Sequence, residues 1–171
     1  MLFRSKRPIF RDDIDRQRFL AYLGAAVDRY AWSSLGYCLM GNHIHLLATG
    51  EPEAVSSGMR DLLGAHARSF NKRAGRSGHL FGDRFHHVTI TEHDQMVAAV
   101  RYVALNPVRA GLVPRPEDWP WSSYAAIVSN AVPAGTVDVT ALLPLFGRPG
   151  APLAEGGRTD RKSTRLNSSH T

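Results

Sequence analysis

Two histidines separated by one residue, His43 and His45, have a spacing that suits metal chemistry. They lie in an alternating apolar stretch, and in a β-strand residues two apart project from the same face, with Cα atoms about 6.6 to 7 Å apart. Both imidazoles can therefore reach one ion, while Ile44 points to the opposite face. Such a pair is also typical of the solvated face of a sheet, so a second group is needed to indicate a site.

A tyrosine and an asparagine four residues apart, Tyr102 and Asn106, supply that second group. On a helix they are neighbours on one face, opposite an apolar stripe that includes Val97 and Val100. A deprotonated phenol is a nucleophile, and an amide oxygen can ligate a metal ion. Each residue also has a purely structural interpretation, the tyrosine as a packing residue and the asparagine as a helix end before Pro107.

The elements that must position these groups follow from hydrophobic periodicity. We predict helices over residues 13–31, 55–74, 94–106 and 122–127, a hairpin of strands 35–40 and 43–48, a third strand over 80–91, and a further short strand within residues 1–9. Gly41 and Asn42 suit a two-residue type II′ turn, and Thr91 suits a helix N-cap. This order predicts an α+β fold of the ferredoxin-like kind, an antiparallel sheet with helices packed on one face.

The chain of 171 residues has the length of one domain, which we place at residues 1–128. Residues 129–157 are rich in alanine, glycine and proline and are expected to be a loosely ordered extension. Residues 158–171 are polar, lack periodicity and resemble a translated sequencing adapter, so they are left out of the fold prediction.

The net charge of +6 points to a polyanionic partner, but its distribution matters. The last 14 residues hold four basic residues and one acid, and without them 17 basic residues face 14 acidic ones, a net charge of +3. Local clustering is the better guide. Lys72, Arg73, Arg76 and Arg84 are the candidate contacts to DNA phosphates. Two aromatic residues suit either base stacking or ordinary packing; they are Phe81 and Trp121.

Several functional classes are excluded by composition. The single cysteine, Cys38, lies in an apolar stretch and cannot form an intrachain disulfide or a cysteine-based zinc site. No apolar run is long enough to span a bilayer, and the first residues have no signal sequence, which predicts a cytoplasmic protein. No nucleotide-binding P-loop is present.

Several motifs occur together and in a fixed order. They lie at residues 37–47, 69–73, 76–85, 101–113 and 117–124. With these motifs the chain closely resembles the REP-associated tyrosine transposases of the insertion-sequence-200-like HUH superfamily, over roughly residues 7 to 127. Three features depart from the family pattern: few residues precede Arg7, which implies a truncated N-terminal edge of the sheet, Gly41 replaces a common proline, and His66 stands where an aromatic residue is frequent.

The resemblance implies a role for each candidate residue. Tyr102 is the expected nucleophile, and His43, His45 and Asn106 are the expected metal ligands. The implied reaction is cleavage and rejoining of single-stranded or hairpin DNA through a 5′-phosphotyrosine intermediate. Mg²⁺ or Mn²⁺ is the implied cofactor, acting as a Lewis acid on the phosphate, although imidazole ligands by themselves favour other metals. A homodimer is a further expectation.

Two alternatives stay open at this stage. A two-histidine phosphoesterase would need two His-x-Thr/Ser motifs, and only residues 87–89 fit. A degraded or domesticated protein could bind hairpin DNA without cutting it. The retained Tyr102, His43 and His45 argue against that alternative, and the short N-terminal segment argues for it.

Overall fold

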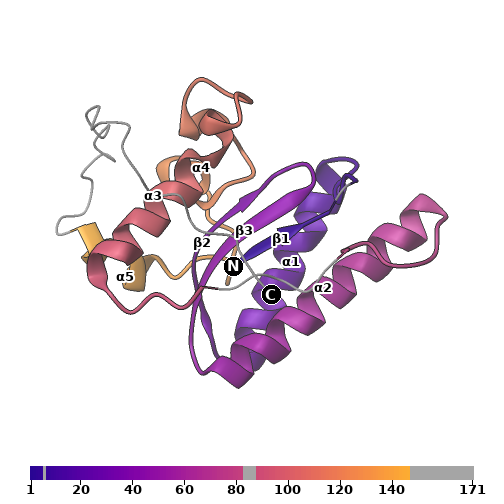
Figure 1. The fold of residues 1–171 in the computed structure, drawn as a ribbon, viewed down its shortest axis with the longest axis horizontal. Coiled ribbons are helices and arrows are strands. Elements are labelled where there is room, and N and C mark those ends of the chain that lie inside the picture. Colours follow the sequence, from indigo (N-terminus) through magenta and orange to yellow (C-terminus); the bar gives the residue numbers. More distant parts are fainter. Residues whose placement is uncertain (6, 83–87, 147–171) are drawn as a thin grey trace, which may run out of the picture.

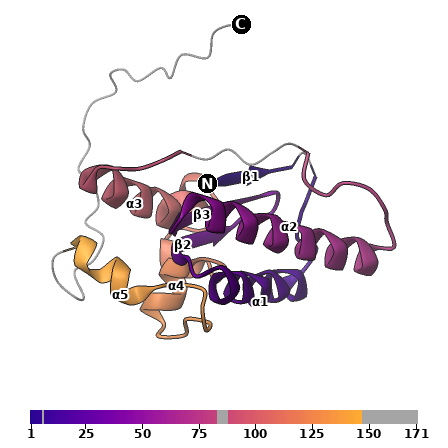
Figure 2. The same ribbon diagram turned by 90° about the horizontal axis from the view of Figure 1, so that it is seen from below.

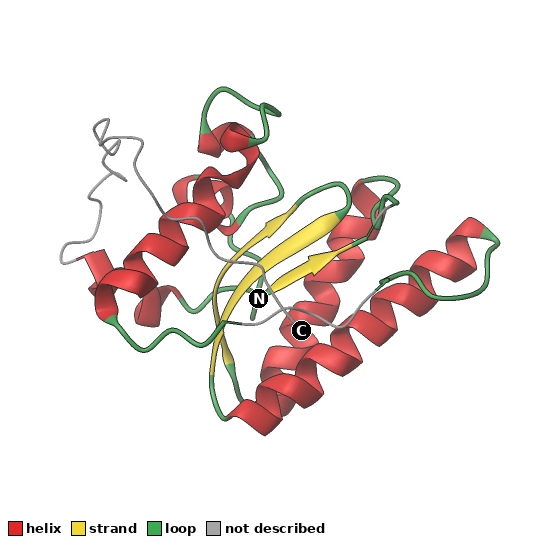
Figure 3. Cartoon of the chain, in the orientation of Figure 1, coloured by secondary structure: helices red, strands yellow, loops and turns green. Residues whose placement is uncertain are grey.

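The computed structural model describes residues 1–5, 7–82 and 88–146. A three-stranded antiparallel sheet lies at its centre in the order β1-β3-β2, with helices on both sides (Figures 1 and 3). The α+β prediction is therefore confirmed. The elements are β1 (Leu2–Arg4), α1 (Asp13–Tyr30), β2 (Ser33–Leu39), β3 (His43–Thr49), α2 (Pro52–Ala74), α3 (His93–Arg109), η1 (Pro116–Asp118), α4 (Ser123–Val128), α5 (Val139–Leu142) and η2 (Leu143–Phe146).

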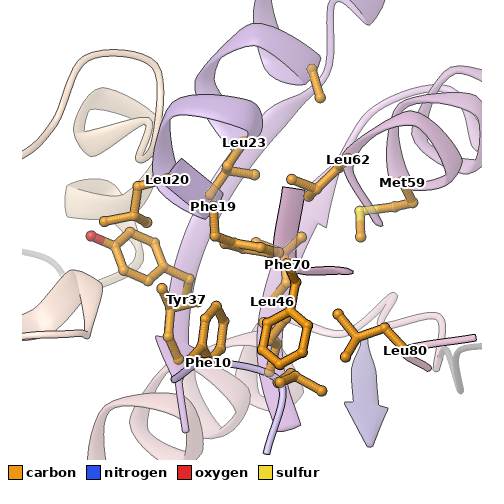
Figure 4. Packing of buried hydrophobic residues seen from close by; sticks show 14 of the residues in the cluster. Phe10, Phe19, Leu20, Leu23, Tyr37, Leu46, Met59, Leu62, Phe70 and Leu80 are labelled. Atoms are coloured by element: carbon orange, nitrogen blue, oxygen red, sulfur yellow. The ribbon is translucent and has the colours of Figure 1, made fainter. Parts of the chain in front are cut away.

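The main core lies between the sheet and the pair formed by α1 and α2, which run side by side (Figures 2 and 4). Phe19 and Leu23 from α1 and Met59 from α2 pack here against the sheet, and all three are fully buried. Ile44 and Leu46 of β3 face the same core because alternate residues of a strand share one face. The remaining alternate positions of β3, which include both histidines, therefore face the other side.

The start of α1 is joined to the end of α2 by an ion-pair network. Asp12 caps α1 by accepting a hydrogen bond from the backbone N–H of Asp15. Arg73, near the end of α2, pairs with both of these carboxylates, and Asp15 is buried. The helix ends at Gly75, whose positive φ of 60° is the left-handed conformation that glycine adopts readily.

The third long helix, α3, lies against the opposite face of the sheet (Figure 1). Leu35 and Cys38 of β2 and Leu47 of β3 pack there against Val103 in a smaller cluster. The prediction that all helices pack on one face of the sheet therefore holds for α1 and α2 only. Because α3 covers the other face, the sheet lies between two layers of helices.

The predicted strand over residues 80–91 is wrong for its described part, because residues 80–82 and 88–91 form no strand. Both edges of the hairpin are already occupied. β1 pairs with β3, which confirms the short strand expected within residues 1–9. On the outer edge of β2, the Tyr37 N–H donates to Ser123 Oγ at 3.0 Å and the Leu39 N–H donates to the Trp121 carbonyl at 2.9 Å. Leu80 instead packs in the core.

The hairpin forms as predicted, but its turn is not type II′. Gly41 does not have the positive φ which that turn requires at its first central residue. The two turn carbonyls instead accept hydrogen bonds from the segment after β1. The Ile9 N–H donates to the Gly41 carbonyl at 3.0 Å, and the Ser5 N–H donates to the Asn42 carbonyl at 2.8 Å.

The predicted boundaries of α3 need two corrections. The helix begins after Glu92 instead of Thr91, and it continues past Pro107 to Arg109. A proline removes a single N–H donor, and the following turn is held because the Ala110 N–H donates to the Asn106 carbonyl at 3.0 Å. Asn106 therefore keeps helical geometry one turn beyond Tyr102.

The short helix predicted over residues 122–127 is confirmed as α4. The loose order expected after Val128 is wrong as far as residue 146. Thr136 and Leu142 are buried, and the Asp138 N–H donates to the Ser34 carbonyl at 2.7 Å, which holds this segment on the end of β2. The division at residue 128 stays a prediction. No helix in the described ranges is long and apolar enough to cross a membrane.

Candidate active site

The two histidines of β3 lie side by side on the face of the sheet that α3 covers. Their ring centroids are 5.0 Å apart and the ring planes are nearly perpendicular, at 86°. His43 Nδ1 is 2.8 Å from Asn42 Oδ1. Because an amide oxygen accepts hydrogen bonds, this contact puts the proton of a neutral His43 on Nδ1 and its lone pair on Nε2. His43 is half-buried and His45 is buried.

His45 is the less satisfied of the two rings. Its Nε2 is buried and makes no hydrogen bond. Burial lowers the pKa of His45 to about 4, and the nearby His43 lowers it further, while the Asn106 side chain opposes the shift. His45 is therefore neutral at pH 7, and neutral imidazole is the form that ligates a metal.

Tyr102 and Asn106 reach the same place from α3. The Tyr102 ring centroid is 5.3 Å from that of His45, with an angle of 84° between the planes. Tyr102 is 46% exposed, so its phenol is open to solvent, whereas Asn106 is buried. The structure thus brings together the four residues that the sequence singled out. The role of each residue stays a prediction.

The donor set suits a metal ion that tolerates mixed nitrogen and oxygen ligands. Among the described residues, no group of three or more His, Cys, Asp or Glu side chains could hold a metal. A metal at this position would therefore use the two imidazoles and the amide oxygen of Asn106, which leaves coordination positions open for other oxygen ligands. The unpartnered Nε2 of His45 fits such a use.

A cavity of about 670 Å³ opens beside these groups, between β3 and α3. His45 and Tyr102 form part of its wall, and apolar side chains such as Ile90, Met96 and Val103 form much of the rest. The candidate reacting groups therefore border a cavity whose wall is mostly apolar.

The residues predicted to contact DNA differ in their exposure and in their interactions within the protein. Lys72 is exposed. Arg73 is held by Asp12 and Asp15, so its donors serve the fold. Arg76 stacks over the Phe70 ring at 5.9 Å. The fourth predicted contact, Arg84, lies outside the described residues.

The two aromatic residues considered for base stacking contribute to packing. Phe81 contacts the main core, with its ring centroid 6.2 Å from that of His66. Trp121 is half-buried, with the Arg16 guanidinium 5.5 Å from its ring centroid. Packing is thus the interpretation that the structure supports for both.

The prediction from sequence missed two arginines next to Tyr102. The Arg109 guanidinium lies 5.2 Å from the Tyr102 ring centroid, and Arg101 precedes the tyrosine. A signal was available, because residues seven apart on a helix lie on nearly the same side. The basic residues that cluster in the sequence lie elsewhere, around the end of α2.

The chain is similar to known proteins in sequence and in fold. The family model described as Transposase IS200 like matches residues 1–106, more than half of the chain. The chain belongs to the IS200-like transposase family. A solved structure described as a REP-associated tyrosine transposase bound to a REP hairpin is similar to it, with a TM-score of 0.60 and 19% identity, covering 80% of this chain and 84% of that one. A search of curated proteins gives no match.

The resemblance seen in the sequence of this IS200-like transposase is therefore confirmed, both for the family and for the fold. The family assignment gives no support to a two-histidine phosphoesterase. The motif considered for that alternative begins at His87, which lies outside the described residues.

Proposed function

We propose that this IS200-like transposase cleaves and rejoins single-stranded or hairpin DNA, with Tyr102 as the nucleophile. One observation carries the proposal: a solvent-open phenol from α3 meets a buried, neutral His45 whose Nε2 has no partner. A tyrosine used only for packing would bury its ring. A buried ring nitrogen without a partner also occurs at His66 in the core, so the support comes from the contact of His45 with an exposed tyrosine. The arrangement instead leaves reactive groups unsatisfied at one place, as functional sites do.

The proposed reaction is a phosphoester exchange. The Tyr102 oxygen loses its proton to solvent and attacks the phosphorus of a DNA phosphodiester. The bond between phosphorus and the 3′-oxygen breaks, and that oxygen takes up a proton to become a free 3′-hydroxyl. The product is a 5′-phosphotyrosine linkage, whose bond energy allows a later 3′-hydroxyl to reverse the step. No nucleotide cofactor is required.

A divalent ion, Mg²⁺ or Mn²⁺, is the proposed cofactor, held by His43, His45 and Asn106. When bound, it would neutralise charge on the phosphate oxygens. The chain's own residues supply the geometry. Residues Leu2 and Cys38 pair with His45 from the two neighbouring strands and fix its backbone on the central strand. The two imidazoles are then pre-positioned before any ligand arrives.

The proposed partner is hairpin DNA with a single-stranded segment at the reaction centre. The solved structure similar to this one is described as bound to a REP hairpin. A flexible single strand brings its phosphate to a tyrosine on a helix more easily than a stacked duplex does. Lys72 and Arg76 are the proposed contacts with other phosphates. Assembly into a homodimer stays a prediction, which sedimentation of the purified protein tests.

The experiment is incubation of the protein with labelled single-stranded hairpin oligonucleotides and Mn²⁺, followed by denaturing electrophoresis. We expect a covalent protein–DNA species from the wild type and none from Tyr102→Phe, with similar DNA affinity for the two. Tyr22→Phe, on α1, is the matched control and should react like the wild type. His43→Ala should lose the stimulation by metal. A protein that binds the hairpin in a salt-sensitive way but never forms the covalent species would instead be the non-cutting binder.

A further inference from the structure

The outer side of Tyr102, away from His45, carries two arginines. Arg109 lies two helical turns beyond Tyr102 on nearly the same side of α3. Its guanidinium is 5.2 Å from the Tyr102 ring centroid, within the range of a cation–π contact. The Tyr102 ring is thus in contact with His45 on one side and with Arg109 on another.

The hydrogen-bond donors of both arginines are available for a ligand. Within the described part of the chain, neither Arg101 nor Arg109 makes a hydrogen bond or an ion pair, and the Nε of Arg101 is buried without a partner. Arg73 shows the contrast, because its guanidinium is bound by two carboxylates. The terminal nitrogens of both guanidinium groups are therefore able to donate hydrogen bonds to an anion that reaches this face of α3.

Both arginines share one face of α3 with the nucleophile. Arg101, Leu105 and Arg109 lie around Tyr102 on this face, and Asp94 is its acidic residue. Asp94 forms no ion pair with either arginine, so two positive charges face one negative charge. The planar fork of a guanidinium matches the oxygens of a phosphate.

We propose that Arg101 and Arg109 bind the DNA phosphate next to the one that Tyr102 attacks, and that Arg109 also fixes the orientation of the Tyr102 ring. The inference rests on the proposed function, since it assigns the reacting phosphate to the His45 side of the ring and its neighbour to the arginine side. Arg109 is then a positioning residue for the nucleophile. Arg101 contributes only to the binding of DNA and not to the position of the tyrosine.

The first test measures DNA binding without any reaction, using a single-stranded oligonucleotide and a chelator. Each single-strand phosphate contact adds about 0.7 to the slope of log affinity against log salt. Because the two arginines bind one phosphate, the Arg101→Gln/Arg109→Gln double variant should lose about 0.7 from the slope of the wild type. Arg29→Gln removes an equally positive charge from the exposed side of α1 and should leave the slope unchanged. A double variant with the slope of this control overturns the proposal.

The second test separates positioning from binding, by the rate of covalent adduct formation at saturating DNA with Mn²⁺. Arg109→Gln should slow the reaction by about 100-fold, because a small misplacement of a reacting group has an effect of that size. Arg109→Lys should recover only part of the rate, since an ammonium lacks the planar fork. Arg101→Gln should weaken binding without changing the saturated rate.

The outcomes distinguish this inference from the proposed function. A wild type that forms no adduct while the double variant still loses the salt slope would reject the nucleophile and keep the phosphate-binding pair. A wild type that reacts, together with an Arg109→Gln variant of equal saturated rate, would reject the positioning role. Circular dichroism of each variant checks that the fold is intact.

Discussion

The two faces of the sheet differ in how their charged groups are paired. On the α1/α2 face, the buried carboxylate of Asp15 is neutralised by Arg73 and accepts the Arg11 N–H at 2.9 Å. On the α3 face, the Nε2 of His45 and the Nε of Arg101 are buried without partners. The first face is organised for stability, because its buried charge is compensated. Buried nitrogens without hydrogen-bond partners also occur on the first face, at Trp32 and His66. Those of the second face lie beside an exposed tyrosine, which is an arrangement that binding and catalysis use.

Breaking the ion-pair network should have the largest effect on stability. Asp15→Ala leaves Arg73 with only Asp12 and empties a fully buried site. Loss of one partner of a buried ion pair costs about 3 to 5 kcal/mol of unfolding free energy. Urea denaturation measures this loss. Asp61→Ala, which removes an exposed partner of both Arg29 and the Tyr30 hydroxyl, is the control and should cost about 1 kcal/mol or less. Equal losses for the two variants would contradict the contrast between buried and exposed pairs.

Close packing on the α1/α2 side gives the next prediction. A Cβ added at Gly58 would overlap Nε1 of Trp32, which is buried. Gly58→Ala should therefore cost about 1 to 3 kcal/mol through overpacking. On the same helix, a Cβ at Gly64 would meet only the flexible Arg68 guanidinium, at 3.1 Å. Gly64→Ala should instead gain about 0.5 to 1 kcal/mol from helix propensity. Thermal or urea unfolding that gave both variants the same sign would contradict this packing argument.

Much of the fold could be predicted from the sequence, and the predictions that were wrong have physical causes. Local periodicity is enough to define α1, the hairpin and the face shared by His43 and His45. The segment 80–91 was wrongly predicted as a strand because its β-branched and aromatic residues satisfy the local pattern. Strand formation there depends on pairing with the sheet, and both outer edges of the β2–β3 hairpin are taken by segments distant in sequence.

The candidate site could be predicted only in part, because local spacing shows which residues share a face but does not show contacts between distant segments. Tyr102 and Asn106 share a face by helical spacing, which the sequence shows directly. The engagement of Arg73 depends on Asp12 and Asp15, which lie about 60 residues away in sequence. No local rule reports such a pairing. The sequence alone therefore does not show that the guanidinium of Arg73, a predicted DNA contact, is already paired with carboxylates.

The pH dependence of stability gives a smaller effect, which involves His66 on the α1/α2 face. Burial lowers the pKa of His66, while its contact with the Ile9 carbonyl and nearby Asp15 oppose the shift. Below the ordinary histidine pKa of about 6.5, the unfolded chain therefore binds more protons at this residue than the folded protein does. Stability is lost as the pH falls below that value. The loss is at most about 1.4 kcal/mol per pH unit for one proton.

His66→Phe should reduce this loss between pH 7 and pH 5, measured by urea unfolding at each pH. His45 contributes in the same direction, since its pKa is lowered to about 4. The variant should therefore keep part of the pH dependence. If the curve of His66→Phe matches that of the wild type over the whole range, His66 is not one of the groups responsible.

The smallest expected change in stability lies on the α3 face. His45→Leu replaces a buried imidazole with an unpaired nitrogen by an apolar side chain of similar size. Removal of an unsatisfied buried polar group should stabilise the fold by about 1 kcal/mol, while covalent DNA attachment is lost. Thermal unfolding measures the gain in stability, and the adduct assay measures the loss of covalent attachment. A clear destabilisation would mean that His45 serves the fold.

The central claim is that the Tyr102 oxygen becomes bonded to DNA, and mass spectrometry of the digested protein–DNA product tests it most directly. After nuclease and protease treatment of wild-type protein incubated with hairpin DNA and Mn²⁺, we expect a nucleotide mass on the peptide that contains Tyr102. A nucleotide mass on a different residue would contradict the account, as would its complete absence from protein that binds the DNA.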